Sequence, residues 1–239
     1  KPRHTPPPTG SSSGSASLTA KRRSPRCKKM PTPMPLEPSP VAPFFRDAVA
    51  LTIAGSDPSG GAGLQADLKT FQQLGVYGMS VVTLLTVQNT QRVERVVALE
   101  PELVVQQLRA VMSDISPRAI KLGALGNAAI IEAVAQELAT VNVPIVIDPV
   151  MISKHGHALI DDDAIESYRQ LLFPKSFLIT PNRFEAEKLT GMSIRTFEDV
   201  QVAVHQLHHM GCKNVLLKFG RVENKYNVYF SDRDGTVQF

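Results

Sequence analysis

From residue 48 onward, short apolar runs alternate with amphipathic stretches, and this alternation constrains the fold most. The apolar runs are rich in β-branched residues and predict buried strands at 48–54, 80–87, 119–122, 144–148, 177–180 and 214–218. Helical spacing of apolar residues predicts helices at 64–74, 101–111, 127–138, 164–172, 183–189 and 197–210. Strands separated by helices predict an α/β fold with a mostly parallel sheet covered on both faces. Residues 226–239 predict a hairpin that turns at Asp234-Gly235.

Residues 1–46 differ sharply in composition from residues 47–239. They hold nine of the 26 Lys and Arg residues, a single acid (Glu37) and 11 of the 18 prolines. Their net charge is +8 and that of residues 47–239 is −4, so the basic character of the chain belongs to this segment. We expect a disordered tail at 1–46 and one domain at 47–239. Because no aromatic residue is interleaved with the basic cluster, we expect neither a nucleic-acid partner nor a membrane partner.

The cysteine content and the hydropathy indicate a reducing compartment. Cys27 and Cys212 are the two cysteines, too few for a disulfide framework or a cysteine metal site. We expect Cys212 to pack as a small buried residue. No apolar run reaches the roughly 18 residues that a membrane span needs. We therefore predict a cytoplasmic protein; an organellar transit peptide is the alternative, and the tail lacks the amphipathic helix typical of one.

A glycine-rich run, Gly55 to Gly63, follows the first strand at the edge where parallel sheets bind ligands. It fails the Walker A pattern because Gly61 stands where a lysine is needed. Its glycines permit close approach of a ligand, and the helix that follows offers free N–H groups to an anion or polar group. A purely structural tight turn is the competing interpretation.

Polar side chains follow the other strands. Gln88 ends the second strand, and its amide can read the donor and acceptor edge of a heterocycle. Acids and a lysine stand at later strand ends, where they can hold Mg²⁺ and a polyphosphate, the electrostatic requirement of phosphoryl transfer: Asp148, Glu185 and Lys218. Taken singly, each is also typical of a strand-end cap or turn. Asp67 lies one turn into the first helix and, taken alone, is typical of a solvated helix acid.

Four segments together resemble the hydroxymethylpyrimidine/phosphomethylpyrimidine kinases of thiamine biosynthesis, members of the ribokinase-like superfamily. They are 51–71, 86–90, 148–151 and 180–186, and the resemblance extends over about residues 47–232. It implies a three-layer α/β/α fold. It also implies ATP- and Mg²⁺-dependent phosphorylation of 4-amino-5-hydroxymethyl-2-methylpyrimidine and then of its monophosphate.

The resemblance implies a role for each matching residue. Gln88 would recognise the aminopyrimidine, with Gly55, Asp67 and Val150 around the same substrate. ATP and its phosphates would be bound by Asn182, Lys218 and Asp148, with Lys218 contacting the transferring phosphate. Mg²⁺ would be held by Glu185 and Asp148. Relatives are often dimers, so a homo-oligomer is a further implication, although no residue identifies an interface.

Three departures from the family pattern affect the expected activity. Phe219-Gly220-Arg221 replaces the usual Gly-Gly-His, which we expect to crowd or recharge the phosphate site. Ala124 replaces a common Met, which we expect to widen the pocket. The family's Gly-Thr-Gly-Cys segment, with its anion hole and catalytic base, does not occur in the sequence. We therefore expect weak or absent activity, and poor stability of the chain on its own because apolar surface would be exposed.

Two other functions remain open. Pyridoxal kinases share the Asn-x-x-Glu motif of Asn182 and Glu185, so a pyridoxal kinase-like enzyme is one alternative. A non-catalytic pyrimidine-binding protein, which kept the pocket and lost phosphoryl transfer, is the other.

Overall fold

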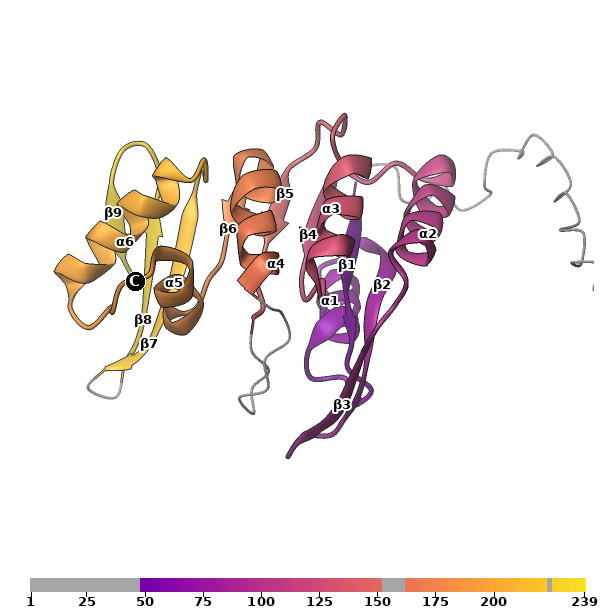
Figure 1. Ribbon diagram of the computed structural model, residues 1–239, viewed down its shortest axis with the longest axis horizontal. Coiled ribbons are helices and arrows are strands. Elements are labelled where there is room, and N and C mark those ends of the chain that lie inside the picture. The colour runs from indigo at the N-terminus through magenta and orange to yellow at the C-terminus, as the bar shows by residue number, and fades with distance from the viewer. Residues whose placement is uncertain (1–47, 152–161, 223–224) are drawn as a thin grey trace, which may run out of the picture. The chain divides into compact units, whose positions relative to one another are not determined.

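The computed structural model describes residues 48–151, 162–222 and 225–239 (Figure 1). The predicted tail at 1–46 lies outside these ranges. Within them, nine strands form one sheet in the order β3-β2-β1-β4-β5-β6-β7-β8-β9. Their bounds are β1 Val49–Ser56, β2 Tyr77–Gln88, β3 Val93–Ala98, β4 Ala119–Leu122, β5 Ile145–Ile147, β6 Leu178–Ile179, β7 Val215–Val222, β8 Lys225–Ser231 and β9 Thr236–Gln238.

The strand pairing confirms a mostly parallel sheet. β1 pairs parallel with both β2 and β4, and the parallel pairing continues through β5 and β6 to β7. Antiparallel pairs occur at the two sides of the sheet: β3 on β2, then β8 on β7 and β9 on β8. The predicted terminal hairpin is confirmed as β8 and β9. The strand β3 was not predicted, because the apolar residues of its sequence VERVVA neither alternate with polar ones nor form one unbroken run; four of its six residues are exposed.

Helices cover both faces of the sheet. They are α1 Gly63–Gln73, α2 Pro101–Asp114, α3 Ala128–Glu137, α4 Asp162–Ser167, α5 Arg183–Thr190 and α6 Phe197–His209. The crossover from β1 to β2 runs in the opposite direction along the sheet to the later crossovers. Right-handed connections therefore put α1 on one face and the later helices on the other, where α2, α3 and α4 lie side by side (Figure 1). None of the described helices is long and apolar enough to cross a membrane.

Local signals fix several helix boundaries. Asn127 accepts a hydrogen bond from the backbone N–H of Ile130 and so caps the start of α3. Thr196 and Asp199 form a capping box at the start of α6. Gly75, which follows α1, has a φ of 70°, a left-handed conformation that glycine adopts without steric cost. These ends match the sequence prediction to within one or two residues.

The helix predicted at 164–172 changes its winding midway. The α-helix α4 ends at Ser167, and a π-helical turn follows over Tyr168–Leu172. In that turn the N–H of Phe173 donates to the carbonyl of Tyr168, five residues earlier. Tyr168 and Phe173 are both fully buried, with ring centroids 6.2 Å apart. The wider turn thus keeps two large aromatic side chains inside the core.

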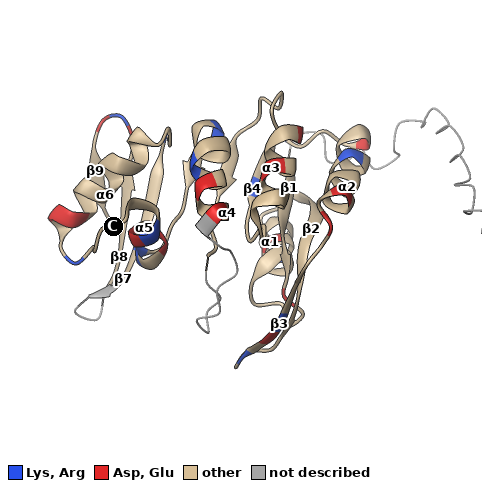
Figure 2. Cartoon of the chain, in the orientation of Figure 1, with Lys and Arg blue, Asp and Glu red and all other residues tan. Residues whose placement is uncertain are grey.

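The core lies between the sheet and its helices and is centred on β1. Leu51 and Ile53 of this strand have no exposed surface, and Figure 2 shows the charged residues mainly on helices, loops and the edge strand β3. Cys212 is 3% exposed and belongs to the same core, which confirms the prediction for this residue. Burial raises the pKa of its thiol to about 12, so the group stays protonated and packs as an apolar side chain.

Truncating a leucine of β1 tests this assignment of the core. We expect Leu51→Ala to lower the free energy of unfolding by about 2–5 kcal/mol, because it removes apolar surface and leaves a cavity at a fully buried site. Leu103→Ala makes the same chemical change on α2, where the side chain is 47% exposed, and should cost less than about 1 kcal/mol. Urea unfolding of both variants provides the measurement. Equal losses would contradict the placement of the core.

Candidate active site

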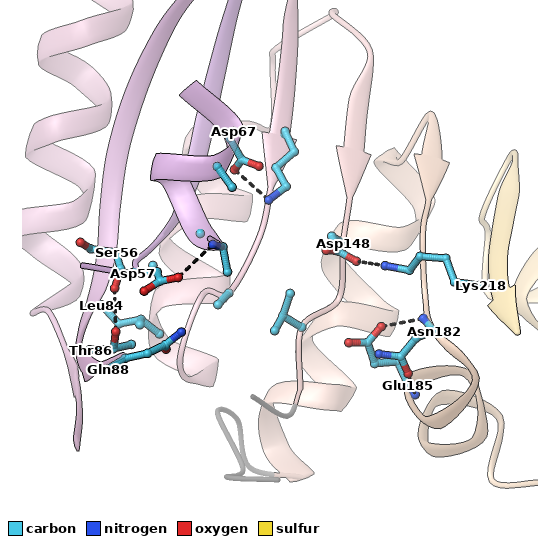
Figure 3. Close-up of a pocket in the computed structure, with 17 residues that line it drawn as sticks. Ser56, Asp57, Asp67, Leu84, Thr86, Gln88, Asp148, Asn182, Glu185 and Lys218 are labelled. Carbon is cyan, nitrogen blue, oxygen red and sulfur yellow. Dashed lines mark hydrogen bonds and ion pairs between the residues drawn. The ribbon is translucent and has the colours of Figure 1, made fainter. Parts of the chain in front are cut away.

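A pocket of about 370 Å³ opens beyond the carboxyl ends of the parallel strands (Figure 3). β1 has β2 on one side and β4 on the other, so the connections leaving these strands diverge at this point of the sheet. Crevices of this kind are the usual ligand sites of open α/β sheets. All eight residues that the sequence singled out line this one pocket: Gly55, Asp67, Gln88, Asp148, Val150, Asn182, Glu185 and Lys218.

The glycine-rich loop is held by the carboxylate of Asp57, which is 4% exposed. Its Oδ1 accepts hydrogen bonds from the backbone N–H and the hydroxyl of Ser59, at 2.8 and 2.7 Å. Its Oδ2 accepts from the N–H groups of Gly61 and Ala62, at 3.2 and 2.9 Å. Burial would raise the pKa of Asp57, but these hydrogen bonds outweigh it and hold the pKa below its ordinary value. Asp57 therefore supplies the cap that Ala62, at the N-cap position of α1, cannot.

The same loop is tied back to β1 and β2. Gln65 accepts a hydrogen bond from the N–H of Asp57 and donates one to the hydroxyl of Ser56. Thr86 of β2 donates to the carbonyl of Ser56 at 2.9 Å. Gly63 has a φ of 58°, and a Cβ there would collide with the carbonyl oxygen of Gly55. Glycine at position 63 thus allows α1 to start directly over the end of β1.

One wall of the pocket is formed by alternate residues of β2. Leu84, Thr86 and Gln88 line the cavity, as expected for side chains two residues apart on a strand. A Cβ at Gly55 would lie 2.5 Å from Leu84 Cδ1 and 3.7 Å from the Cβ of Ala124, so these residues converge at that wall. The wall is apolar at its inner part and ends in the amide of Gln88.

Asp67 does not behave as a solvated helix acid. Its Oδ2 accepts a hydrogen bond from the hydroxyl of Thr52 at 2.6 Å and forms an ion pair with Lys121 Nζ at 2.8 Å. Thr52 and Lys121 are register partners on β1 and β4. The side chains of Asp67 and Lys121 are 19% and 23% exposed and both line the pocket. The carboxylate therefore faces the cavity with one oxygen already neutralised.

The opposite wall carries the other charged groups. Lys218 of β7 forms an ion pair with Asp148 Oδ1 at 2.9 Å, and Thr180 donates to the same oxygen at 3.2 Å. The Lys218 side chain is 42% exposed, so its ammonium group can also meet a ligand. Figure 3 shows this pair on the side of the cavity across from Gln88.

Asn182 and Glu185 form a reciprocal capping box at the start of α5. Asn182 Oδ1 accepts from the N–H of Glu185 at 2.9 Å, and Glu185 Oε2 accepts from the N–H of Asn182 at 2.7 Å. Glu185 is 5% exposed, and burial raises its pKa to about 7. The backbone hydrogen bond opposes this rise, whereas the nearby Asp148 carboxylate adds to it. Two carboxylates that repel each other here would both be stabilised by a cation.

The donor set fits a hard divalent cation that shares its ligands with phosphates and water. Among the described residues, no group of three or more His, Cys, Asp or Glu side chains is placed to hold a metal. Mg²⁺ typically takes one or two protein carboxylates and completes its shell with water and substrate oxygens. Asp148 and Glu185 match that requirement.

Several pocket residues escaped the sequence analysis. Asp57 could have been found, because an Asp two residues before a Ser in a glycine-rich run is typical of an Asx turn. Ser56, Thr86 and Leu84 carry no distinctive local signal, and Lys121 becomes significant only through Asp67, 54 residues away.

Two expected departures have different outcomes. Ala124 lines the pocket, as the expectation of a wider cavity requires. Phe219 is not among the described lining residues; its ring packs edge-on against Tyr229, with centroids 5.9 Å apart. Phe219 thus does not narrow this pocket, and the expected effect of Phe219-Gly220-Arg221 on the phosphate site stays a prediction. The side chain of Arg221 lies outside what the structure describes.

Comparisons with known proteins find relatives over most of the described residues. Residues 57–239 match the family model for phosphomethylpyrimidine kinase. A hydroxymethylpyrimidine/phosphomethylpyrimidine kinase of Bacillus subtilis is 48% identical over 172 residues, which are 72% of this chain and 64% of that protein. This chain thus spans less than two thirds of the length of that relative.

Solved structures agree with the sequence relatives. The crystal structure of phosphomethylpyrimidine kinase from Clostridium difficile is 40% identical, with a TM-score of 0.74 over 81% of this chain and 84% of that one. A pyridoxal kinase from Staphylococcus aureus, solved in complex with AMP-PCP and pyridoxal, is 34% identical, with a TM-score of 0.72 over 80% of this chain and 70% of that one. With this fold, this pocket and these matches, the chain belongs to the phosphomethylpyrimidine kinase family.

Proposed function

We propose that this chain carries the substrate and nucleotide sites of a kinase that phosphorylates 4-amino-5-hydroxymethyl-2-methylpyrimidine and then its monophosphate, with ATP as the phosphoryl donor. The observation that carries the proposal is the convergence of Gln88 and of the Lys218–Asp148 pair on opposite walls of one pocket. A phosphoryl transfer enzyme must hold an acceptor ring and a polyphosphate side by side, and this pocket has a group suited to each.

The pyrimidine would lie against the wall formed by β2. The Gln88 amide offers one acceptor and two donors, a set that can pair with both the ring nitrogen and the exocyclic amine of an aminopyrimidine. Gly55 leaves room for the ring to approach the backbone, and Val150 contributes apolar surface from the loop after β5. Asp67, held by Lys121, is a charged acceptor for a substrate hydroxyl. These contacts would fix the ring with its hydroxymethyl group directed at the phosphates.

The phosphates of ATP would lie against the charged wall. In the reaction the hydroxymethyl oxygen forms a bond to the γ-phosphorus, the bond from that phosphorus to the bridging oxygen of ADP breaks, and the hydroxyl proton passes to solvent water. Negative charge moves to the bridging oxygen and stays on the equatorial oxygens, so the Lys218 ammonium stabilises the transferring group. Asn182, at the start of α5, is placed to contact the same phosphates.

Asp148 and Glu185 are the residues that would hold Mg²⁺. When bound, the ion would neutralise phosphate charge and orient the polyphosphate. Glu185 also anchors the N–H of Asn182 at 2.7 Å, so the same carboxylate keeps the first turn of α5 in position.

A pyridoxal kinase-like activity is the second candidate, favoured by one specific observation. A pyridoxal kinase solved in complex with AMP-PCP and pyridoxal is 34% identical to this chain and has the same fold. Competition between the two heterocycles distinguishes the candidates: the amide of Gln88 favours the aminopyrimidine, and tighter binding of pyridoxal would reverse the assignment.

Replacing Gln88 tests recognition of the pyrimidine. We expect Gln88→Leu to weaken binding of 4-amino-5-hydroxymethyl-2-methylpyrimidine by about tenfold or more, because both ring contacts lose their partner. ATP binding should stay unchanged. Titration calorimetry measures both affinities, with Gln106→Leu on the exposed side of α2 as the matched control. Unchanged pyrimidine affinity in the Gln88 variant would count against the proposal.

Replacing Lys218 tests the nucleotide side. Lys218→Met should weaken ATP binding by about tenfold or more, because a charge-assisted contact to phosphate is lost, and should leave pyrimidine affinity unchanged. Lys218→Arg keeps the charge and should recover part of the loss. Lys213→Met removes an exposed lysine just before β7 and serves as the control. If the Lys213 and Lys218 variants bind ATP equally well, Lys218 has no phosphate role.

The metal assignment is tested by comparing ATP binding with and without Mg²⁺. In the wild-type chain we expect Mg²⁺ to strengthen ATP binding, and in Glu185→Gln we expect most of that gain to disappear. The amide oxygen of Gln can still accept from the N–H of Asn182, so the start of α5 should be retained. Glu187→Gln, on the same helix, is the control, because Glu187 accepts a backbone bond from Ile194. An undiminished gain in the Glu185 variant would refute the assignment.

A further inference from the structure

The segment Gly123–Leu125, between β4 and α3, forms part of the pocket wall that we assign to the pyrimidine. Ala124 lines the cavity, close to Gly55 and Leu84. Leu125, the next residue, has no exposed surface and belongs to the core. Neighbouring residues of this segment thus face the pocket and the core. The orientation of the backbone at Ala124 therefore sets how far its side chain extends into the cavity.

Two buried hydroxyls donate to consecutive carbonyls of this segment. Thr83 Oγ1, on β2, donates to the carbonyl of Ala124 at 2.6 Å. Tyr168 Oη, in the π-helical turn, donates to the carbonyl of Gly123 at 3.2 Å. Both donor side chains are fully buried, and neither is among the described residues lining the pocket. The two hydroxyls thus contact this wall on its buried side, away from the cavity.

The two hydroxyls bond to a part of the backbone that contains a glycine, Gly123. Gly123 has no side chain to restrict its dihedral angles, and none could be added, since a Cβ would lie 2.8 Å from Lys121 Nζ and 2.9 Å from Ala54 Cβ. Its N–H is already bonded to the carbonyl of Ile53 at 2.9 Å. With that end fixed, the carbonyls of Gly123 and Ala124 decide the orientation of the peptide units on either side of the Ala124 Cα.

The π-helical turn brings one of these donors into reach. Tyr168 and Phe173 both lie in the core at this turn. The Tyr168 hydroxyl donates to the carbonyl of Gly123, which is 45 residues earlier in the sequence. Burial raises the pKa of Tyr168 well above its ordinary value, so the hydroxyl keeps its proton and remains a donor. Irregular helical turns of this kind often accompany functional sites.

We propose that Thr83 and Tyr168 are positioning residues that hold Ala124 against the pyrimidine ring, and that they set the affinity of the pocket for that ring without touching it. This inference rests on the proposed function. The alternative is that the two hydroxyls only satisfy buried carbonyls and so contribute to stability alone.

Variants of nearly unchanged shape separate these two roles. Tyr168→Phe and Thr83→Val each remove one donor and leave the packing volume almost as it was. Thr83→Ser keeps the hydroxyl and loses a methyl group. Ser176→Ala is the matched control, because Ser176 Oγ is a fully buried hydroxyl that donates to the carbonyl of Phe173 at 2.7 Å, outside the described pocket lining.

The measurements are three: the affinity of the full chain for 4-amino-5-hydroxymethyl-2-methylpyrimidine, its affinity for ATP with Mg²⁺, and its thermal midpoint. We expect Tyr168→Phe and Thr83→Val to weaken pyrimidine binding by about three- to tenfold, the equivalent of one neutral hydrogen bond, with ATP affinity unchanged. Thr83→Ser should retain wild-type pyrimidine affinity. Ser176→Ala should lower the thermal midpoint and leave both affinities unchanged.

The outcomes distinguish this inference from the function on which it rests. If the wild-type chain binds the pyrimidine and both donor-removing variants bind it equally well, the positioning role is overturned while the proposed function stands. If the wild-type chain does not bind the pyrimidine, the proposed function fails and this inference fails with it. Should Thr83→Val show no cooperative thermal transition, Tyr168→Phe decides the matter by the same two affinities.

Discussion

The parallel pairing of β1 with β2 on one side and β4 on the other determines where the rest of the site can lie. Seven of the eight residues of β1 are buried, so this strand is fixed in the middle of the core. Parallel strands deliver their carboxyl ends to one edge, and the change of direction between β2 and β4 opens a crevice at that edge. Residues as distant in sequence as Gly55 and Lys218 therefore line the same cavity.

The two walls of that cavity are built by different physical means. The wall of β1, β2 and the Gly123–Leu125 segment depends on close backbone packing. It has glycines where a Cβ would collide, and the ionised Asp57 accepts hydrogen bonds from the backbone N–H groups of the glycine-rich loop. The facing wall depends on placed charges, with Lys218 balancing Asp148 beside the buried Glu185. A closely packed surface, on which Asp67 is paired with Lys121, suits a flat ring, and a surface with an exposed ammonium group suits phosphate oxygens.

Much of this architecture could be predicted from the sequence, because β-branched runs and strand-end residues are local signals. Gln88, Asp148, Glu185 and Lys218 could be grouped from their positions alone, since parallel strands end together. Other features could not be predicted because they arise only from tertiary contacts. β3 is largely exposed and lacks a strong apolar pattern, and the π-helical turn at Tyr168 interrupts a segment whose spacing reads as a plain helix. Thr83 and Tyr168 matter only through carbonyls 41 and 45 residues away.

The division of the pocket also follows the order in which a ribosome makes the chain. The pocket residues from Gly55 to Ala124 lie on β1, α1, β2 and β4 or in the connections beside these elements. Chains emerge from their N-terminus, so these residues are synthesised before Asp148 and Lys218. Tyr168 is made later and then bonds to Gly123. On the proposed function, most of the pyrimidine wall is therefore synthesised before the charged wall, whereas Val150 and Tyr168 join it with the second half of the sheet.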